Sequence, residues 1–107
     1  GSLVKLTGGV EIATAHSGLD GPVAVTINPT AVALYTEEPT GSPRNSWHCH
    51  VESIEFVADV ARVSLVGPFD ISADITRAAV ADLGIDTGSA VWASLKATEV
   101  GIQLLQG

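Results

Sequence analysis

Two short stretches of this chain combine a cation with hydroxyl or amide groups at the edge of an apolar run. One is Ser42-Pro43-Arg44-Asn45 and the other is Ser94-Leu95-Lys96-Ala97-Thr98. Arg44 and Lys96 are two of only five Lys and Arg residues in the chain. Cations, hydroxyls and free backbone N–H groups together suit a small oxyanion, because charge-assisted hydrogen bonds are the strong ones. We therefore interpret the two stretches as parts of one oxyanion site, which a folded sheet or a partner subunit must bring together.

The bulk composition limits the classes of protein to consider. A chain of 107 residues with 46% hydrophobic and 16% charged residues is typical of one globular domain. A net charge of −7 argues against nucleic-acid and anionic-membrane partners, which need a basic face. The sequence contains no run of eighteen apolar residues and no basic segment ahead of an apolar one. We therefore expect neither membrane insertion nor secretion. The single cysteine, Cys49, excludes an internal disulfide and predicts a reducing, cytoplasmic setting.

Short apolar segments separated by Gly, Pro, Asn and Asp turns predict an all-β chain. A phase slip near Ser53 indicates a β-bulge within one long strand. Thr76 as N-cap and Gly84 as the residue after the last turn delimit the one convincing helix, residues 77–83. These elements together predict an OB-like small β-barrel with one short helix. The expected strands span residues 3–6, 10–15, 23–27, 31–35, 47–57, 60–66, 69–75, 91–95 and 100–104.

An internal repeat relates residues 23–34 to residues 91–102 without gaps. Both segments read as a strand, a two-residue break, a Thr and a second strand; the alternative is chance similarity between apolar strand pairs. Asn28-Pro29 stands in the first copy where Lys96-Ala97 stands in the second. Because proline has no N–H to donate, the first copy is expected to have lost any ability to bind an anion.

The order of motifs between residues 42 and 104 resembles the molybdate-binding Mop/TOBE domains. Members of that family carry S-A-R-N-x-L-x-G-x-V on an early strand and I-K-A-T or I-K-A-S at the end of a late strand. Here residues 42–51 read S-P-R-N-S-W-H-C-H-V and residues 95–98 read L-K-A-T, while residues 75–88 look like the family's I-T…L-G-L-x-x-G segment. Residues 25–34 are similar to the V-R-P-x-A-V-x-L strand near the C-terminus of ABC transporter ATP-binding subunits.

The resemblance implies a fold, a ligand and partners. Residues 1–40 would be an incomplete TOBE-like half and residues 41–107 a Mop-like half of one C-terminal regulatory domain. The ligand would be molybdate or tungstate, bound at a homodimer interface, with no cofactor. The further partners would be a nucleotide-binding domain outside this sequence and, through it, a membrane permease. Carried over position by position, the residues implied in oxyanion binding are Ser42, Arg44, Asn45, Lys96, Ala97 and Thr98.

Three departures from the family pattern leave other functions open. Pro43 replaces Ala and removes one N–H donor, Cys49 replaces the usual Gly, and Ala79 replaces a common Ser. One alternative is a structural dimerisation domain whose site no longer binds. Another is a regulatory domain for a different substrate, such as sulfate or a sugar.

The sequence favours neither a metal site nor an enzyme. On a strand, His48 and His50 share one face and Cys49 lies on the other, so we expect two exposed histidines beside a buried cysteine. There is no G-x-x-x-x-G-K-[ST] loop, no G-x-S-x-G and no Ser–His–Asp set with a defined context. We expect any ATPase activity to reside in the separate nucleotide-binding domain.

Overall fold

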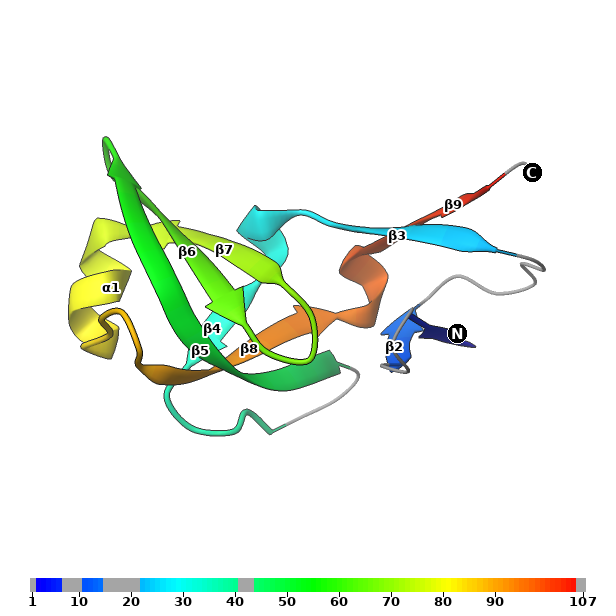
Figure 1. Ribbon diagram of the computed structural model, residues 1–107, viewed down its shortest axis with the longest axis horizontal. Coiled ribbons are helices and arrows are strands. Elements are labelled where there is room, and N and C mark those ends of the chain that lie inside the picture. The colour runs from blue at the N-terminus through cyan, green and yellow to red at the C-terminus, as the bar shows by residue number, and fades with distance from the viewer. Residues whose placement is uncertain (1, 7–10, 15–21, 41–43, 106–107) are drawn as a thin grey trace.

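The structure is a computed structural model, and it describes residues 2–6, 11–14, 22–40 and 44–105. Over these residues the chain consists of strands, one α-helix and two single-turn 3-10 helices, η1 and η2 (Figure 1). The predicted all-β class with one short helix is confirmed. The elements are β1 (Ser2–Lys5), β2 (Glu11–Thr14), β3 (Val23–Ile27), η1 (Pro29–Ala31), β4 (Ala33–Tyr35), β5 (Arg44–Val57), β6 (Val60–Val66), β7 (Ile71–Thr76), α1 (Arg77–Leu83), β8 (Ala90–Lys96), η2 (Ala97–Glu99) and β9 (Val100–Leu104).

Five strands form one antiparallel sheet in the order β4-β8-β5-β6-β7. Strand β7, at one edge, also lies against η1 and β4, so the sheet curls around its core into a small barrel. Two further pairs, β1 with β2 and β3 with β9, stand outside this sheet. In Figure 1 the β3–β9 ribbon extends away from the barrel, on the side opposite α1.

Strand β5 pairs with β8 along its first half and with β6 along its second. The register shifts between Val51 and Ser53, which confirms the predicted bulge. Trp47, Cys49 and Val51 are buried ahead of the bulge, whereas Phe56 beyond it is 46% exposed. The bulge shifts the inward-facing positions from odd to even residue numbers, which keeps Ile54 packed against the core beyond it.

The core fills the interior of the curled sheet. Strand β6 shows the clean alternation expected of a half-buried strand, with its odd-numbered residues from 61 to 65 inside. Trp47 closes one end by an edge-to-face contact with Phe69, with ring centroids 5.0 Å apart. The fully buried large side chains are Ile12, Val63, Leu65, Val91, Leu95 and Val100.

Helix α1 begins and ends at the residues that the sequence indicates. Thr76 Oγ1 accepts the Ala79 N–H at 3.0 Å, which satisfies one of the free donors of the first turn. Gly84 adopts φ 65°, a left-handed conformation that only glycine adopts at no steric cost. No helix in the described part of the chain is long and apolar enough to span a membrane.

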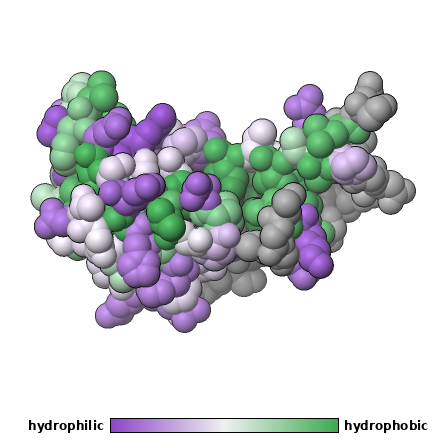
Figure 2. Space-filling view, viewed as in Figure 1, coloured by the Kyte–Doolittle hydropathy of each residue, from purple (hydrophilic) through white to green (hydrophobic). Residues whose placement is uncertain are grey.

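The two copies of the repeat have the same secondary structure and cross each other. The first is β3-η1-β4 and the second is β8-η2-β9. The first strand of each copy pairs with the second strand of the other, so β3 pairs with β9 and β4 with β8. Figure 2 shows hydrophobic residues gathered where the β3–β9 pair extends from the barrel. The crossing also brings the two 3-10 turns, η1 and η2, to opposite sides of one hollow.

Candidate functional site

The sheet joins the two cation-bearing stretches at the backbone. Strand β5 begins at Arg44, three residues earlier than the strand predicted from the sequence, and Arg44 is the register partner of Lys96 on β8. A separation of about fifty residues along the chain is therefore closed within one chain. Ser42 and Pro43 lie outside the described residues, and Arg44 is described by its backbone alone.

Lys96, Ala97 and Thr98 form the junction between β8 and η2. Lys96 occupies the N-cap position with an exposed side chain, and no side chain accepts a hydrogen bond from the turn. Ala97 is 7% exposed, and its carbonyl accepts the Val100 N–H that closes the turn. Thr98 is exposed. The second copy of the repeat thus presents a cation and a Thr at a turn whose first donors have no side-chain acceptor.

The first copy shows what such a turn does when an acceptor is present. Asn28 occupies the N-cap of η1, the position equivalent to Lys96. Its Oδ1 accepts both from the Thr30 N–H at 3.0 Å and from Thr30 Oγ1 at 2.9 Å. In the first copy, Thr30 therefore directs its N–H and its hydroxyl towards one oxygen, and that oxygen belongs to a side chain of the protein, Asn28.

Asn45 points into the protein and binds backbone. Its Oδ1 accepts the Ala13 N–H at 2.7 Å, and its Nδ2 donates to the Ala13 carbonyl at 2.9 Å. A longer contact of 3.4 Å joins Nδ2 to the Leu95 carbonyl. Asn45 is only 8% exposed. Both amide protons therefore have carbonyl acceptors, and a bound anion would have to compete with these bonds.

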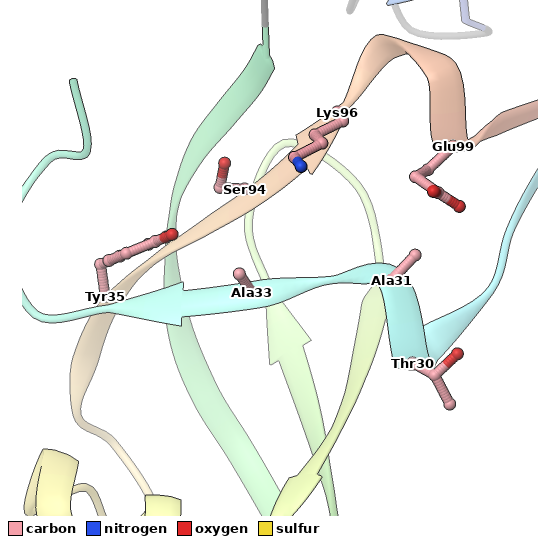
Figure 3. A pocket seen from close by; sticks show the side chains of 7 residues that line it. All are labelled: Thr30, Ala31, Ala33, Tyr35, Ser94, Lys96 and Glu99. Atoms are coloured by element: carbon pink, nitrogen blue, oxygen red, sulfur yellow. The ribbon is translucent and has the colours of Figure 1, made fainter. Parts of the chain in front are cut away.

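A hollow of about 340 Å³ opens beside Lys96. Figure 3 shows that η1 and β4 form one wall and that the end of β8 and η2 form the other. Strand β8 contributes Ser94 and Lys96, and η2 contributes Glu99. No ion pair joins Lys96 to Glu99, and none joins Lys96 to any other described carboxylate. The facing wall is formed by Thr30, Ala31, Ala33 and Tyr35.

The histidines and the cysteine of β5 are arranged as the strand pattern predicts. His48 and His50 are exposed, and His48 lies against Trp92 with ring centroids 5.0 Å apart. Cys49 is buried, and burial raises the pKa of its thiol, while a backbone contact at Ala93 opposes part of the shift. Within the described ranges, no group of three or more His, Cys, Asp or Glu side chains is placed to hold a metal ion.

Ser94 belongs to the second cation-bearing stretch but is not among the residues that the resemblance implies in oxyanion binding, and the structure puts it in the hollow. Ser94 lies two residues before Lys96 on the same strand, and strand periodicity alone puts the two on one face. A serine inside an apolar strand carries no motif, so only the hollow beside it marks it as a candidate.

The fold and the site define a small OB-like β-barrel module with a cationic turn at the end of one strand. A family model described as TOBE domain matches residues 41–102. The solved structure of the cytoplasmic molybdate-binding protein ModG, with molybdate bound, superposes with a TM-score of 0.70 and 31% sequence identity. That likeness covers 78% of this chain and 62% of the ModG chain.

Two curated relatives extend the comparison. The molybdate/tungstate import ATP-binding protein WtpC of Pyrococcus abyssi is 33% identical over 95 residues, which are 88% of this chain and 27% of the relative. The molybdenum import ATP-binding protein ModC of Mycobacterium tuberculosis is 38% identical over 78 residues, which are 69% of this chain and 21% of the relative. This chain thus spans about a quarter of the length of these relatives. The chain belongs to the TOBE domain family.

Proposed function

We propose that this chain is an oxyanion-binding regulatory domain of an ABC importer's ATP-binding subunit, with molybdate or tungstate as its ligand. The relative WtpC is named a molybdate/tungstate import ATP-binding protein, and the relative ModC is named a molybdenum import ATP-binding protein. The structural neighbour ModG is a molybdate-binding protein. The ligand residues in this proposal are Ser42, Arg44, Asn45, Lys96, Ala97 and Thr98.

The contrast between the two turns of the repeat carries the proposal. In η1 an internal oxygen, Asn28 Oδ1, takes both donors of Thr30. In η2 the equivalent residue is Lys96, which has no acceptor atom, and the turn has no side-chain cap. An oxyanion oxygen at η2 would receive the two donors of Thr98 and the charge of Lys96, with Arg44 next to Lys96 in the sheet.

The expected affinity is adequate for a biological ligand. Hydrogen bonds to charged groups contribute roughly 1.5–3 kcal/mol each. Four of them, less the costs of association and desolvation, give about −8 kcal/mol, which corresponds to a dissociation constant near 1 μM.

One chain supplies donors from one side only, which is the reason to place the site at a homodimer interface. Lys96 and Thr98 are both exposed at the same turn. A tetrahedral dianion accepts hydrogen bonds in all directions, so a second copy must cover the open side to complete its coordination. A ligand that binds one dimer arrangement preferentially would bias the attached ATPases towards a resting state.

Isothermal titration calorimetry with sodium molybdate, tungstate and sulfate tests the ligand. We expect heat from molybdate and tungstate, and a loss of affinity of about ten-fold or more in Lys96→Ala, because a charged donor is removed. Lys5→Ala is the matched control, since Lys5 is also an exposed lysine but lies on β1 and does not line the hollow. No heat from any oxyanion at millimolar concentration would leave a dimerisation domain as the better assignment, and heat from sulfate alone would identify a different transporter.

Sedimentation equilibrium tests the interface. We expect a dimer at high micromolar concentration, made tighter by molybdate because the ligand contacts both copies. A molybdate-bound monomer would contradict an intersubunit site.

A further inference from the structure

The hollow beside Lys96 has a serine hydroxyl on its wall. Ser94 is 4% exposed and lies in the middle of the sheet, in register with Ala33 on β4 and with Ser46 on β5. Its hydroxyl makes no hydrogen bond to any other described residue, and no buried side-chain oxygen or nitrogen among the described residues lacks a partner, so this hydroxyl is open to the hollow. A hydroxyl that faces a hollow and makes no bond within the described chain is available to a ligand or to water.

The space above Ser94 exists because its neighbours are small. Beside Thr30 and Tyr35, η1 and β4 each present an alanine to the hollow, Ala31 and Ala33, and each alanine carries a single methyl group. The volume of about 340 Å³ exceeds that of several water molecules, at about 30 Å³ each. A tetrahedral oxyanion fits within it.

The hollow is lined by one cation, Lys96, and one carboxylate, Glu99. Figure 3 shows the Lys96 amine and the Ser94 hydroxyl on the same wall, while the Glu99 carboxylate is directed away from them. The two donors come from alternate residues of one strand, β8, which is held by β4 on one side and β5 on the other. The sheet therefore fixes the positions of the two residues in the backbone.

We propose that the Ser94 hydroxyl donates a hydrogen bond to an oxygen of the bound oxyanion that Lys96 neutralises. Through this contact Ser94 helps to select which size of anion binds. The inference rests on the proposed function and extends its ligand set into the hollow between η1 and β8. Because Ser94 and Lys96 start from fixed positions on β8, the larger anions molybdate and tungstate bridge the hydroxyl and the ammonium group more readily than sulfate does.

Calorimetry with sodium molybdate on Ser94→Ala tests this contact. We expect the affinity to fall by about ten-fold or more, because a hydrogen bond to a charged group is lost. We also expect the preference for molybdate over sulfate to narrow. Ser64→Ala is the matched control, since Ser64 is a half-buried serine on β6 that does not line the hollow.

A second variant fills the hollow and leaves the hydroxyl in place. Ala33→Val adds two methyl groups opposite Ser94, and valine is favourable in a strand, so the fold is expected to persist. Molybdate affinity should again fall by about ten-fold or more if the anion occupies this space.

The outcomes separate this inference from the proposed function. Wild-type affinity in both Ser94→Ala and Ala33→Val, with weakened binding in Lys96→Ala, would overturn the role of Ser94 and leave the proposed function standing. An absence of molybdate binding by the wild-type chain would overturn both.

Discussion

At the scale of single residues, Asn45 links two parts of the chain that no strand ladder joins. Its carboxamide pairs with the N–H and the carbonyl of Ala13, as a neighbouring strand's peptide group would. The β1–β2 hairpin is thereby fastened to the end of β5, next to Lys96. Within the S-P-R-N motif, the Asn thus has a structural task in addition to the ligand role that the resemblance implies.

Asn45→Ala is expected to lower the free energy of unfolding by about 2–3 kcal/mol, because two backbone groups of Ala13 lose their partner. Urea unfolding measures the loss, and hydrogen exchange at the Ala13 amide locates it. Ser46→Ala is the control, since Ser46 is the next residue of β5 and its hydroxyl makes no hydrogen bond to the described residues. Full stability together with a protected Ala13 amide would show that Asn45 does not hold the hairpin.

A second residue-scale constraint joins Cys49 and Gly67. A Cβ at Gly67 would lie 2.7 Å from Cys49 Sγ and 3.2 Å from the His48 carbonyl oxygen. Cys49 is fully buried, so its sulfur has little space into which to move. Gly67 is therefore required by the close approach of the thiol.

Gly67→Ala is expected to destabilise the protein by about 1–3 kcal/mol through overpacking. In a Cys49→Ala background, the same substitution should cost about 1 kcal/mol less, since the sulfur that it meets is gone. Urea unfolding of the four proteins in this cycle gives the coupling. Equal costs in the two backgrounds would place the strain at the His48 carbonyl instead.

At the scale of elements, the two strand–turn–strand units differ chiefly in the residue that precedes the turn. Asn28 closes η1 with its own oxygen, and Lys96 leaves η2 open. The open turn therefore lacks the stabilisation that an N-cap side chain provides, as is common where stability is exchanged for function.

Lys96→Asn is expected to close η2 and to abolish oxyanion binding at the same time. The new Oδ1 would accept from the Thr98 N–H, which should stabilise the fold by up to about 1 kcal/mol, while the cation is lost. Asn28→Ala is the complementary variant, and we expect it to lower the free energy of unfolding by about 0.5–1 kcal/mol. The loss is small because water can hydrogen-bond to the exposed Thr30 N–H in place of Asn28. Urea unfolding and molybdate calorimetry measure the two effects, and unchanged stability in both variants would mean that these caps contribute nothing.

The local elements are the part of the fold that the sequence predicts well. The bulge near Ser53, the helix between Thr76 and Gly84, and the buried Cys49 between two exposed histidines all follow from period and capping. These features depend on neighbours a few residues apart, which a single sequence displays directly.

The pairing of distant strands could not be predicted in the same way. Nothing in the alternation of β3 indicates that its partner is β9, and the interior amide of Asn45 depends on where β2 comes to lie. Ser94 was named within its stretch but not as a ligand, because its place at the hollow depends on Ala31 of η1 and Ala33 of β4, which are distant in sequence. The juxtaposition of Arg44 with Lys96 was anticipated only as something that a sheet or a partner must achieve.

At the scale of the whole molecule, a small cationic site lies within an acidic protein. The formal net charge is −7, and the described fold extends over 42 × 29 × 23 Å. The screening length is about 30 Å at 0.01 M salt and about 10 Å at 0.1 M. At low salt an approaching dianion therefore meets the repulsion of most of the protein, whereas at higher salt it meets chiefly the groups near Lys96.

The rate constant for molybdate association is accordingly expected to rise as sodium chloride increases from about 0.01 to about 0.1 M. Stopped-flow measurement of tryptophan fluorescence is suitable, since Trp92 lies on β8, two residues before Ser94 and four before Lys96. Neutral glycerol in place of salt controls for viscosity. A steady fall in the rate constant with salt would mean that the local cations dominate at long range.

The crossing of the two repeat units has a consequence for how this chain can change during evolution. Val23 to Tyr35 pairs with Trp92 to Leu104 in one continuous register, although each segment is interrupted by its own turn. Five residues separate the paired parts of each segment, Ile27 from Ala33 and Ser94 from Val100. An insertion or deletion in one turn would put either the ribbon or the barrel out of register, unless the other turn changed by the same number of residues. The two turns must therefore keep equal lengths even though their sequences differ, with Asn28 before one turn and Lys96 before the other.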